Sequence, residues 1–369
     1  MEKKSSNKSL HKASVLKNDE FYTQLVDIEK ELKYYKEQFR GKVVYCNCDD
    51  PFESNFFKYF AANFNSLRLK RLIATSYKPS PIANTELVLQ PSLLLGYEDK
   101  VVKKPIKPKG RPKTTANKFI INEVGDINND GAFDLSDIAK QLKANKNNEW
   151  ASLDDEGDFR SKESIELLKQ ADIVVTNPPF SLFREYVAQL IEYDKKFLII
   201  GTNNAMHYKE IFPLIQKNKL WLGYNNGPKK YLVPDNFDGK SVMVIDGKKY
   251  MPMGNTSWFT NLDTTKRHEK LTLYKKYSPE EYLKYDNYDA IEVRRVAEIP
   301  LDYKGAMGVP DTFLDKYNPE QFELIGIPFG DLGKALGVAK NYRGRTDISV
   351  TSSGKTRCPF SRIIIKTKN

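Results

Sequence analysis

The chain has 369 residues, and its 59 Lys and Arg against 48 Asp and Glu give a formal net charge of +11. Apolar residues make up 40% and aromatic residues 12%, enough for a sizeable core, which excludes a globally disordered chain. No run approaches the ~18 consecutive apolar residues of a membrane helix. Residues 1–17 lack the apolar stretch of a secretory signal. Three cysteines exclude a disulfide scaffold, and their spacing argues against structural zinc. We therefore expect a globular, cytoplasmic protein without a bound metal or a membrane contact.

The positive charge favours a polyanionic partner, because neutralised phosphates supply most of the sequence-independent affinity of proteins for nucleic acids. A generically basic soluble protein would have the same composition. Charge alone therefore leaves both readings open.

Strand and helix patterns alternate along much of the chain. Residues 1–18 read as a flexible basic tail, and the apolar spacing from Glu20 to Phe39 predicts a helix capped by Asn18 or Asp19. A strand–helix–strand unit predicts parallel strands with a right-handed crossover. The further elements are expected as strand 42–46, a helix begun by Asp50 and Pro51, strand 69–77, helix 161–169, strand 171–176, helix 181–193 and strand 196–201.

Residues 78–150 interrupt this alternation with a proline-rich stretch, and the part from Lys100 to Lys118 contains eight basic residues and no acidic one. We read it as an insertion on the surface. Beyond Leu222 the pattern changes to short strands and turns. We therefore predict an α/β domain over residues 19–223, carrying the insertion 78–150, and a smaller mixed region over 224–369.

A tetrapeptide with a chemical rationale follows the predicted strand 171–176. It consists of Asn177, Pro178, Pro179 and Phe180, and a helix follows it. Ligands of open α/β sheets bind at the carboxyl ends of strands, so the position suits an active site. The alternative is a Pro-Pro turn with Phe180 in the core.

The chemistry of this tetrapeptide suits an aromatic amine, whose lone pair is delocalised into the ring. The side-chain carbonyl of Asn177 and the main-chain carbonyl of Pro178 would hold the two N–H groups and localise that lone pair. Proline fixes the backbone and offers no competing donor, so these acceptors are preorganised. Phe180 would stack on a base that has been extruded from a duplex.

The tetrapeptide resembles the motif of amino-group methyltransferases that use S-adenosylmethionine. Further runs resemble the EcoRI-type adenine-specific DNA methyltransferase family, and the resemblance covers about residues 17–330. These runs are KNDEFYT from Lys17, VYCNCDDPFESNFFKYF from Val44, GDFRS from Gly157, VVTNPPFSLF from Val174, GNTSWFTNL from Gly254 and the stretch 299–326.

The resemblance implies a Rossmann-like methyltransferase fold with a mainly parallel sheet, and it makes 224–369 a target-recognition region. It also implies a cofactor site for S-adenosylmethionine, with Asp158 and Phe159 meeting the cofactor's adenine. The loop after the first strand lacks the usual Gly-x-Gly, and the second strand lacks the usual acidic residue at its end. The other residues implied for the cofactor are Phe21, Tyr22 and Thr23 from the N-terminal helix, and Cys46, Asn47, Asp49 and Asp50 from the loop.

Two basic segments are candidate DNA contacts. Lys109, Arg111 and Lys113 flank a Gly-Arg-Pro core like that of an AT-hook, which enters the minor groove. A solvated basic linker is the alternative. Arg343 and Arg345 are candidates for phosphate or guanine contacts, or they belong to an ordinary exposed loop.

An acidic segment has the ligand spacing of a calcium loop, from Asp126 to Asp137. Its last position is Asp instead of Glu. We therefore favour an Asp/Asn-rich turn over a metal site.

Together these features predict a site-specific adenine N6-methyltransferase of a restriction–modification or phage/host DNA-protection system. It would act on double-stranded DNA by direct methyl transfer to a flipped adenine, without an obligatory protein partner. The alternatives are an N-methyltransferase for RNA bases or protein glutamine, and a DNA-binding protein whose methyltransferase core has decayed.

Overall fold

The structure is a computed structural model that describes residues 22–48, 54–76, 116–126, 147–154, 156–233 and 241–368. Two compact units divide the chain. The first comprises residues 1–202 with 227–262, and the second comprises residues 203–226 with 263–369. The boundary predicted between residues 223 and 224 separates a catalytic domain from a target-recognition region. This division by function stays a prediction.

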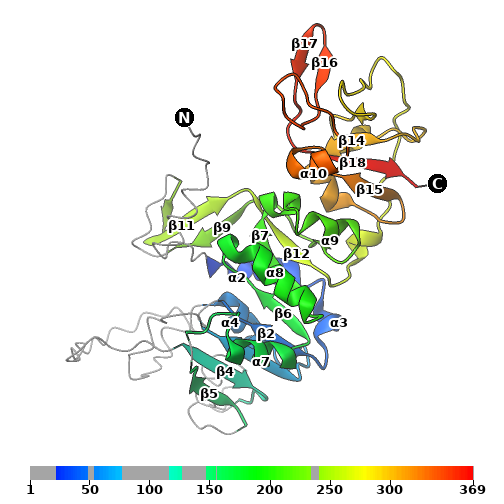
Figure 1. Ribbon diagram of the computed structural model, residues 1–369. Helices are drawn as coiled ribbons and strands as arrows, with labels where there is room; N and C mark the ends of the chain where they lie inside the picture. The colour runs from blue at the N-terminus through cyan, green and yellow to red at the C-terminus, as the bar shows by residue number, and fades with distance from the viewer. Residues whose placement is uncertain are drawn as a thin grey trace, which may run out of the picture. The chain divides into compact units, whose positions relative to one another are not determined.

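The first unit is built around a parallel set of strands, as the sequence predicts (Figure 1). β-branched and aromatic residues in short buried runs favour such strands. The strands are β3 (Arg71–Thr75), β2 (Val43–Cys46), β6 (Ile173–Thr176) and β7 (Lys196–Thr202), adjacent in that order and parallel.

Antiparallel strands extend this sheet at both edges. β4 (Asn117–Ile121) pairs with β3, β5 (Glu149–Ser152) pairs with β4, and β12 (Thr256–Thr260) pairs with β7. The α/β class is confirmed, but the sheet is mixed instead of mainly parallel. The predicted insertion 78–150 is also corrected, since its parts 117–121 and 149–152 are strands of the main sheet.

Helices cover the two faces of this sheet. α4 (Asn55–Ala62) packs on the face that carries Val44 and Leu72, in one core with α2 (Leu25–Leu32). α7 (Lys162–Gln170) and α8 (Phe183–Glu192) lie on the other face, toward the viewer in Figure 1. The alternation of side chains along each strand supplies both apolar faces, which is why the central strands β2 and β6 are buried throughout.

The N-terminal segment differs from its prediction. Tyr22 and Thr23 form β1 (Tyr22–Thr23), which pairs with β9 (Lys229–Leu232), and the helix begins only after Gln24. α3 (Lys36–Phe39) follows as a separate short helix. β10 (Met243–Ile245) and β11 (Lys248–Met253) complete this second sheet, in the order β1-β9-β11-β10.

The predicted helix start at Asp50 is also corrected. Ser54 is the N-cap of α4, and its side chain accepts a hydrogen bond from the Phe57 backbone N–H at 3.4 Å. Serine satisfies an orphan donor of the first helical turn in the same way as the predicted aspartate would.

The second unit has a four-stranded sheet with its own core. The strand order is β13 (Ile291–Glu292), β14 (Met307–Pro310), β18 (Arg362–Thr367) and β15 (Phe322–Gly326). A hairpin of β16 (Val350–Ser352) and β17 (Lys355–Arg357) stands beside it. The remaining elements of this unit are β8 (Trp221–Leu222), α9 (Phe212–Gln216), α10 (Gly330–Ala335) and four short 3-10 turns at 203–207, 265–268, 296–298 and 311–316.

In the part of the chain that is described, none of the helices has the length and apolarity needed to cross a membrane.

Candidate active site

Three adjacent parallel strands end at the same edge of the main sheet. Asn47 follows β2, Ser76 follows β3 and Asn177 follows β6, and all three side chains are buried. Because the strands are parallel neighbours, their carboxyl ends bring these residues together. The described start of the candidate cofactor loop and the Asn-Pro-Pro-Phe tetrapeptide therefore form one candidate site.

Asn47 connects the two halves of that site. The Thr176 hydroxyl donates a hydrogen bond to the Asn47 main-chain carbonyl, and the Tyr186 hydroxyl donates to Asn47 Oδ1. Tyr186 comes from α8, and burial raises its pKa well above the ordinary value, so the hydroxyl keeps its proton. Asn47, the first residue after β2, is thereby held against the strand that ends at the tetrapeptide.

The turn after Asn47 is made without glycine. Cys48 has a φ of 73°, in the left-handed region that glycine adopts most readily, and its Sγ lies 3.6 Å from Asn47 Oδ1. The loop lacks a Gly-x-Gly, and a cysteine adopts the left-handed conformation that glycine usually takes.

A glycine brings the Asp158 loop to the end of β3. Gly157 has a φ of +73°, and a Cβ on it would lie 2.1 Å from the Ser76 carbonyl oxygen. The close approach seats Phe159 in a buried position, with its ring 5.0 Å from that of Tyr186 in an edge-on arrangement. Gln189 on α8 donates to the Phe159 carbonyl at 3.1 Å.

Asp158 is ionised and held by Arg160. The carboxylate accepts from the Arg160 backbone N–H at 2.8 Å and from its guanidinium at 2.7 and 2.9 Å, and this side-chain hydrogen bonding lowers the pKa of Asp158. Arg160 also pairs with Glu185 at 2.9 Å. A fixed carboxylate therefore stands beside Phe159 in the chain.

The tetrapeptide forms a tight turn into α8. The Leu182 N–H donates to the Pro179 carbonyl at 3.0 Å, which starts a short 3-10 turn over Phe180–Leu182. Asn177 and Pro178 are buried, whereas Phe180 is half-buried and packs against the main core. Phe180 thus has a core contact and an accessible part, so both readings of this residue fit its position.

Thr23, on β1, contacts the first turn of the helix that follows the loop. Asn55, the first residue of α4, donates from Nδ2 to the Thr23 carbonyl at 2.7 Å. The Thr23 Oγ1 is buried, and it has no hydrogen-bond partner among the described residues. A buried hydroxyl in that state is a polar group that a ligand can satisfy.

Several predicted site residues fall outside the described residues: Phe21, the side chain of Tyr22, Asp49, Asp50, Lys109, Arg111, Lys113 and the segment 127–137 of the candidate calcium loop. Arg343 and Arg345 are described, and both side chains are exposed. Their backbone N–H groups donate to Asn341 Oδ1 at 2.8 and 3.3 Å, so the loop that carries them is ordered.

Tyr186, Gly157 and Arg160 also adjoin the candidate site residues, and the sequence reasoning gave them no role. Tyr186 occupies an ordinary apolar position of a predicted helix, where nothing marks its hydroxyl. Gly157 directly precedes Asp158, and a glycine next to a candidate binding residue could have indicated a close backbone approach there.

Comparison with known proteins decides the family. Residues 9–368 match the family described as adenine-specific methyltransferase EcoRI. The chain belongs to this family. The resemblance seen in the motifs is confirmed, and the protein is an adenine-specific methyltransferase.

Curated relatives support this family over their whole length. The chain is 44% identical to the Type II methyltransferase M.EcoRI of Escherichia coli, over 100% of this chain and 99% of that protein. It is 38% identical to the Type II methyltransferase M.MpnI of Mycoplasma pneumoniae, over 97% and 98% of the two chains. The Type II methyltransferase M.MgeORF184P of Mycoplasma genitalium is 36% identical, over 96% and 98%. No solved structure matches the chain.

Proposed function

We propose that this family member transfers a methyl group from S-adenosylmethionine to N6 of an adenine flipped out of double-stranded DNA. The observation that carries the proposal is the joining of the Asn177 tetrapeptide to the loop after β2 through Asn47, at the carboxyl edge of the parallel strands. The names of the relatives, all Type II methyltransferases, support the same activity and a role in restriction–modification.

The cofactor fits the residues present at this edge. Thr23 offers a buried hydroxyl without a partner among the described residues, and Phe159 offers a buried aromatic wall for an adenine ring. Asn47 and Asp158 add fixed acceptors. When bound, S-adenosylmethionine supplies a methyl group activated by its sulfonium. We assign Thr23, Cys46, Asn47, Asp158 and Phe159 to its pocket.

The chain's own residues prepare the amine. The side-chain carbonyl of Asn177 and the main-chain carbonyl of Pro178 accept the two N–H groups of adenine, which concentrates the lone pair on N6. Pro178 is buried and its φ is restricted by its ring, so its carbonyl needs no reorganisation during the reaction. The accessible part of Phe180 stacks on the extruded base.

The architecture follows from this assignment. The parallel strands with helices on both faces form a Rossmann-like methyltransferase core, and residues 224–369 select the DNA site. Double-stranded DNA is the partner, which agrees with the net charge of +11.

A labelled-methyl assay on DNA, RNA and protein tests the proposal. We expect incorporation into duplex DNA alone, at an adenine within one sequence, located by single-molecule mapping of methylated bases. Label in RNA or in protein glutamine would refute the proposed substrate. Failure to bind S-adenosylmethionine would instead support a decayed, DNA-binding protein.

Asn177→Ala tests the residue assignment. We expect turnover to fall by about 10³-fold, as for other fixed dipoles that act on a reacting group, while calorimetry shows unchanged cofactor binding. The control Asn148→Ala removes another buried asparagine, whose Oδ1 accepts the Asn122 N–H at 2.8 Å far along the sheet. Full activity in Asn177→Ala would contradict the assignment.

A further inference from the structure

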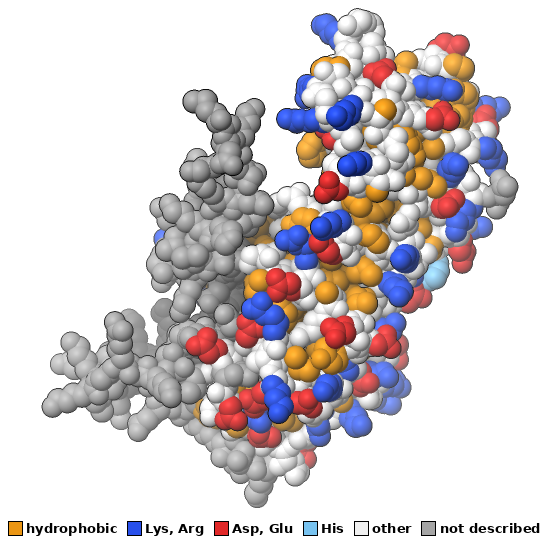
Figure 2. Space-filling view, in the orientation of Figure 1, with side chains coloured by type: hydrophobic (Ala, Val, Ile, Leu, Met, Phe, Trp, Pro, Cys, Tyr) orange, Lys and Arg blue, Asp and Glu red, His pale blue; other side chains and the backbone are white. Residues whose placement is uncertain are grey.

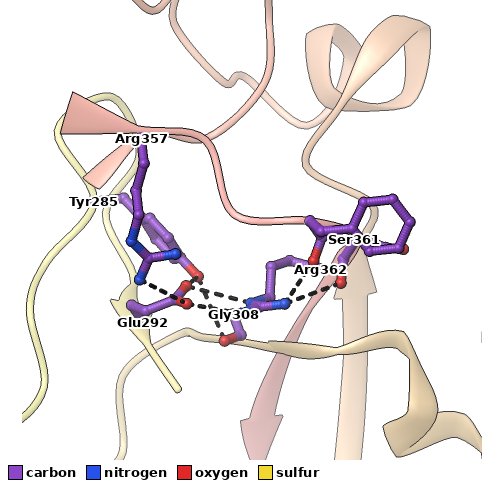
Figure 3. Close-up of polar contacts among 7 residues, drawn as sticks. Tyr285, Glu292, Gly308, Arg357, Ser361 and Arg362 are labelled. Atoms are coloured by element: carbon purple, nitrogen blue, oxygen red, sulfur yellow. Dashed lines mark hydrogen bonds and ion pairs between the residues drawn. The ribbon is translucent and has the colours of Figure 1, made fainter. Parts of the chain in front are cut away.

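The second unit contains a buried carboxylate between two guanidinium groups (Figure 3). Glu292, on β13, is almost fully buried. Arg362 on β18 donates to Glu292 Oε1 at 2.8 Å and to Oε2 at 3.4 Å, and its side chain is only 11% exposed. The Tyr285 hydroxyl donates to Oε2. Arg362 and Tyr285 together therefore neutralise and hydrogen-bond the carboxylate, as a buried charge requires.

The second guanidinium adds a positive charge beyond the one that already neutralises this carboxylate. Arg357, the last residue of β17, lies with Nη2 3.7 Å from Glu292 Oε1, and its side chain is 48% exposed. One carboxylate thus faces two guanidinium groups, and the excess positive charge belongs to the exposed member. The ion pair orients one corner of Arg357, which leaves its other N–H groups for an external acceptor.

The strand that carries Arg357 is itself held in place. Ser353 and Gly354 have φ values of 49° and 73°, the turn geometry that suits a two-residue hairpin. The hydroxyls of Thr351 and Thr356 lie 2.8 Å apart across the hairpin, and Thr351 donates to Asp286 Oδ2 at 3.0 Å. Asp286 adjoins Tyr285, so the hairpin and the buried cluster are attached to the same loop.

The surroundings of Arg357 suit a polyanion. Residues 341–362 contain five Lys or Arg and a single acidic residue, Asp347. Figure 2 shows Lys and Arg side chains over the part of this face that carries β16 and β17. Two aromatic rings of this segment are also exposed, Tyr342 and Phe360, and the guanidinium of Arg343 lies 5.0 Å from the Tyr342 ring centroid.

We propose that Arg357 is a specificity-determining residue that reads a guanine of the DNA site, and that Glu292 is its positioning residue. The inference rests on the proposed function and goes beyond it by naming the contact. Reading O6 and N7 of guanine requires two donors in a fixed geometry. A phosphate contact requires no such orientation, and flexible surface arginines and lysines supply it. A buried carboxylate that orients an exposed guanidinium is the arrangement expected of a contact that reads guanine.

The test compares discrimination between bases. The methylated site of the wild-type enzyme is mapped first, and kcat/KM is then measured on duplexes that carry each single base-pair replacement of that site. In Arg357→Gln we expect discrimination at one G·C pair to fall by about 10- to 100-fold while the other positions keep theirs. Arg357→Lys keeps the charge but lacks the planar fork, so it should lose the same discrimination.

Lys355→Gln is the matched control, since it removes one charge from the same face of the same strand. This variant should bind all duplexes more weakly by the same factor, and the salt dependence of its binding should be lower. If Arg357→Gln behaves in this way, the residue is a phosphate contact and the inference is wrong. A mapped site without a G·C pair, or unchanged discrimination in Arg357→Gln, also overturns it.

The role of Glu292 is tested by a double-mutant cycle. Glu292→Gln, and the milder Tyr285→Phe in case the first variant does not fold, should reduce discrimination at the same G·C pair in the wild-type background and have no further effect in Arg357→Gln. A loss of stability alone, with discrimination intact, would refute positioning. A wild-type enzyme that methylates no DNA refutes the proposed function instead, and its DNA-binding preferences in the same variants still decide this inference.

Discussion

Replacing Gly157 by alanine tests whether the Asp158 loop must lie against the end of β3. The new Cβ would lie 2.1 Å from the Ser76 carbonyl oxygen and 3.0 Å from Ala116 Cβ, and real Cβ contacts under 3.0 Å are essentially never seen. The two backbone segments must therefore separate by about 1 Å, which forfeits part of their packing.

The magnitude follows from two contributions. The φ of +73° costs an alanine about 1 kcal/mol or slightly more. The forced separation adds about 2 kcal/mol, as overpacking does in other tight interiors. We expect the free energy of unfolding to fall by about 3 kcal/mol in total. Because Asp158 and Phe159 follow directly, we also expect kcat/KM for the cofactor to fall by about 10²-fold, the effect of misplacing a binding group by about 1 Å.

Gly247→Ala is the matched control. Its φ is +74°, and a Cβ there meets nothing within 4 Å, so it carries the backbone cost of about 1 kcal/mol without the collision. Urea unfolding and steady-state kinetics with varied S-adenosylmethionine compare the two variants. Equal losses of stability in both, or a cofactor response in Gly157→Ala no larger than in Gly247→Ala, would refute the reasoning.

Two further substitutions probe the same site. Tyr186→Phe removes the donor to Asn47 Oδ1 and should lower the free energy of unfolding by about 1–2 kcal/mol and weaken cofactor binding in calorimetry. Tyr35→Phe, which breaks an equally buried pair with Glu31, should cost at least as much stability and leave cofactor binding unchanged. Equal effects on cofactor binding would argue against a role for Asn47. Arg160→Met removes the guanidinium hydrogen bonds that lower the pKa of Asp158 most, so the wild type should be more stable by less than about 1 kcal/mol at neutral pH. A carboxylate with a lowered folded-state pKa stabilises the protein above its unfolded pKa of about 4 and loses that contribution as the pH falls through the folded value. Urea unfolding from pH 7 to pH 2 should therefore show the two curves converging at the acid end, and a difference that persists there would contradict this account.

Local patterns were sufficient for the central strands and for the tetrapeptide. The runs that became β2, β6 and β7 are buried on both faces, so their β-branched residues needed no partner information to be recognised. Asn177 was placed at a strand end because a strand precedes it and a helix follows it in the chain. The helix expected over 161–169 is α7, and Ser161 is its N-cap.

Local patterns failed where a distant segment decides the structure. Tyr22 and Thr23 lie inside the helix that the apolar spacing from Glu20 predicts, yet they form β1 because β9, some 200 residues later, pairs with them. The sequence analysis placed β4 and β5 in a surface insertion, because the prolines and lysines near them obscure two short strands. In the structure β4 pairs with the edge of β3, and β5 pairs with β4. Pairing energy between strands outweighs local preference in both cases.

The sequence by itself determined the α/β class, the order of the motifs and the family, because these depend on neighbouring residues and on similarity along the chain. The tertiary structure alone decided which side chains meet: Tyr186 with Asn47, Gly157 with Ser76, and Glu292 with Arg357. Each of these pairs joins segments that are distant in the chain. Their contacts depend on strand order and on the packing of side chains, which no periodicity of the sequence encodes.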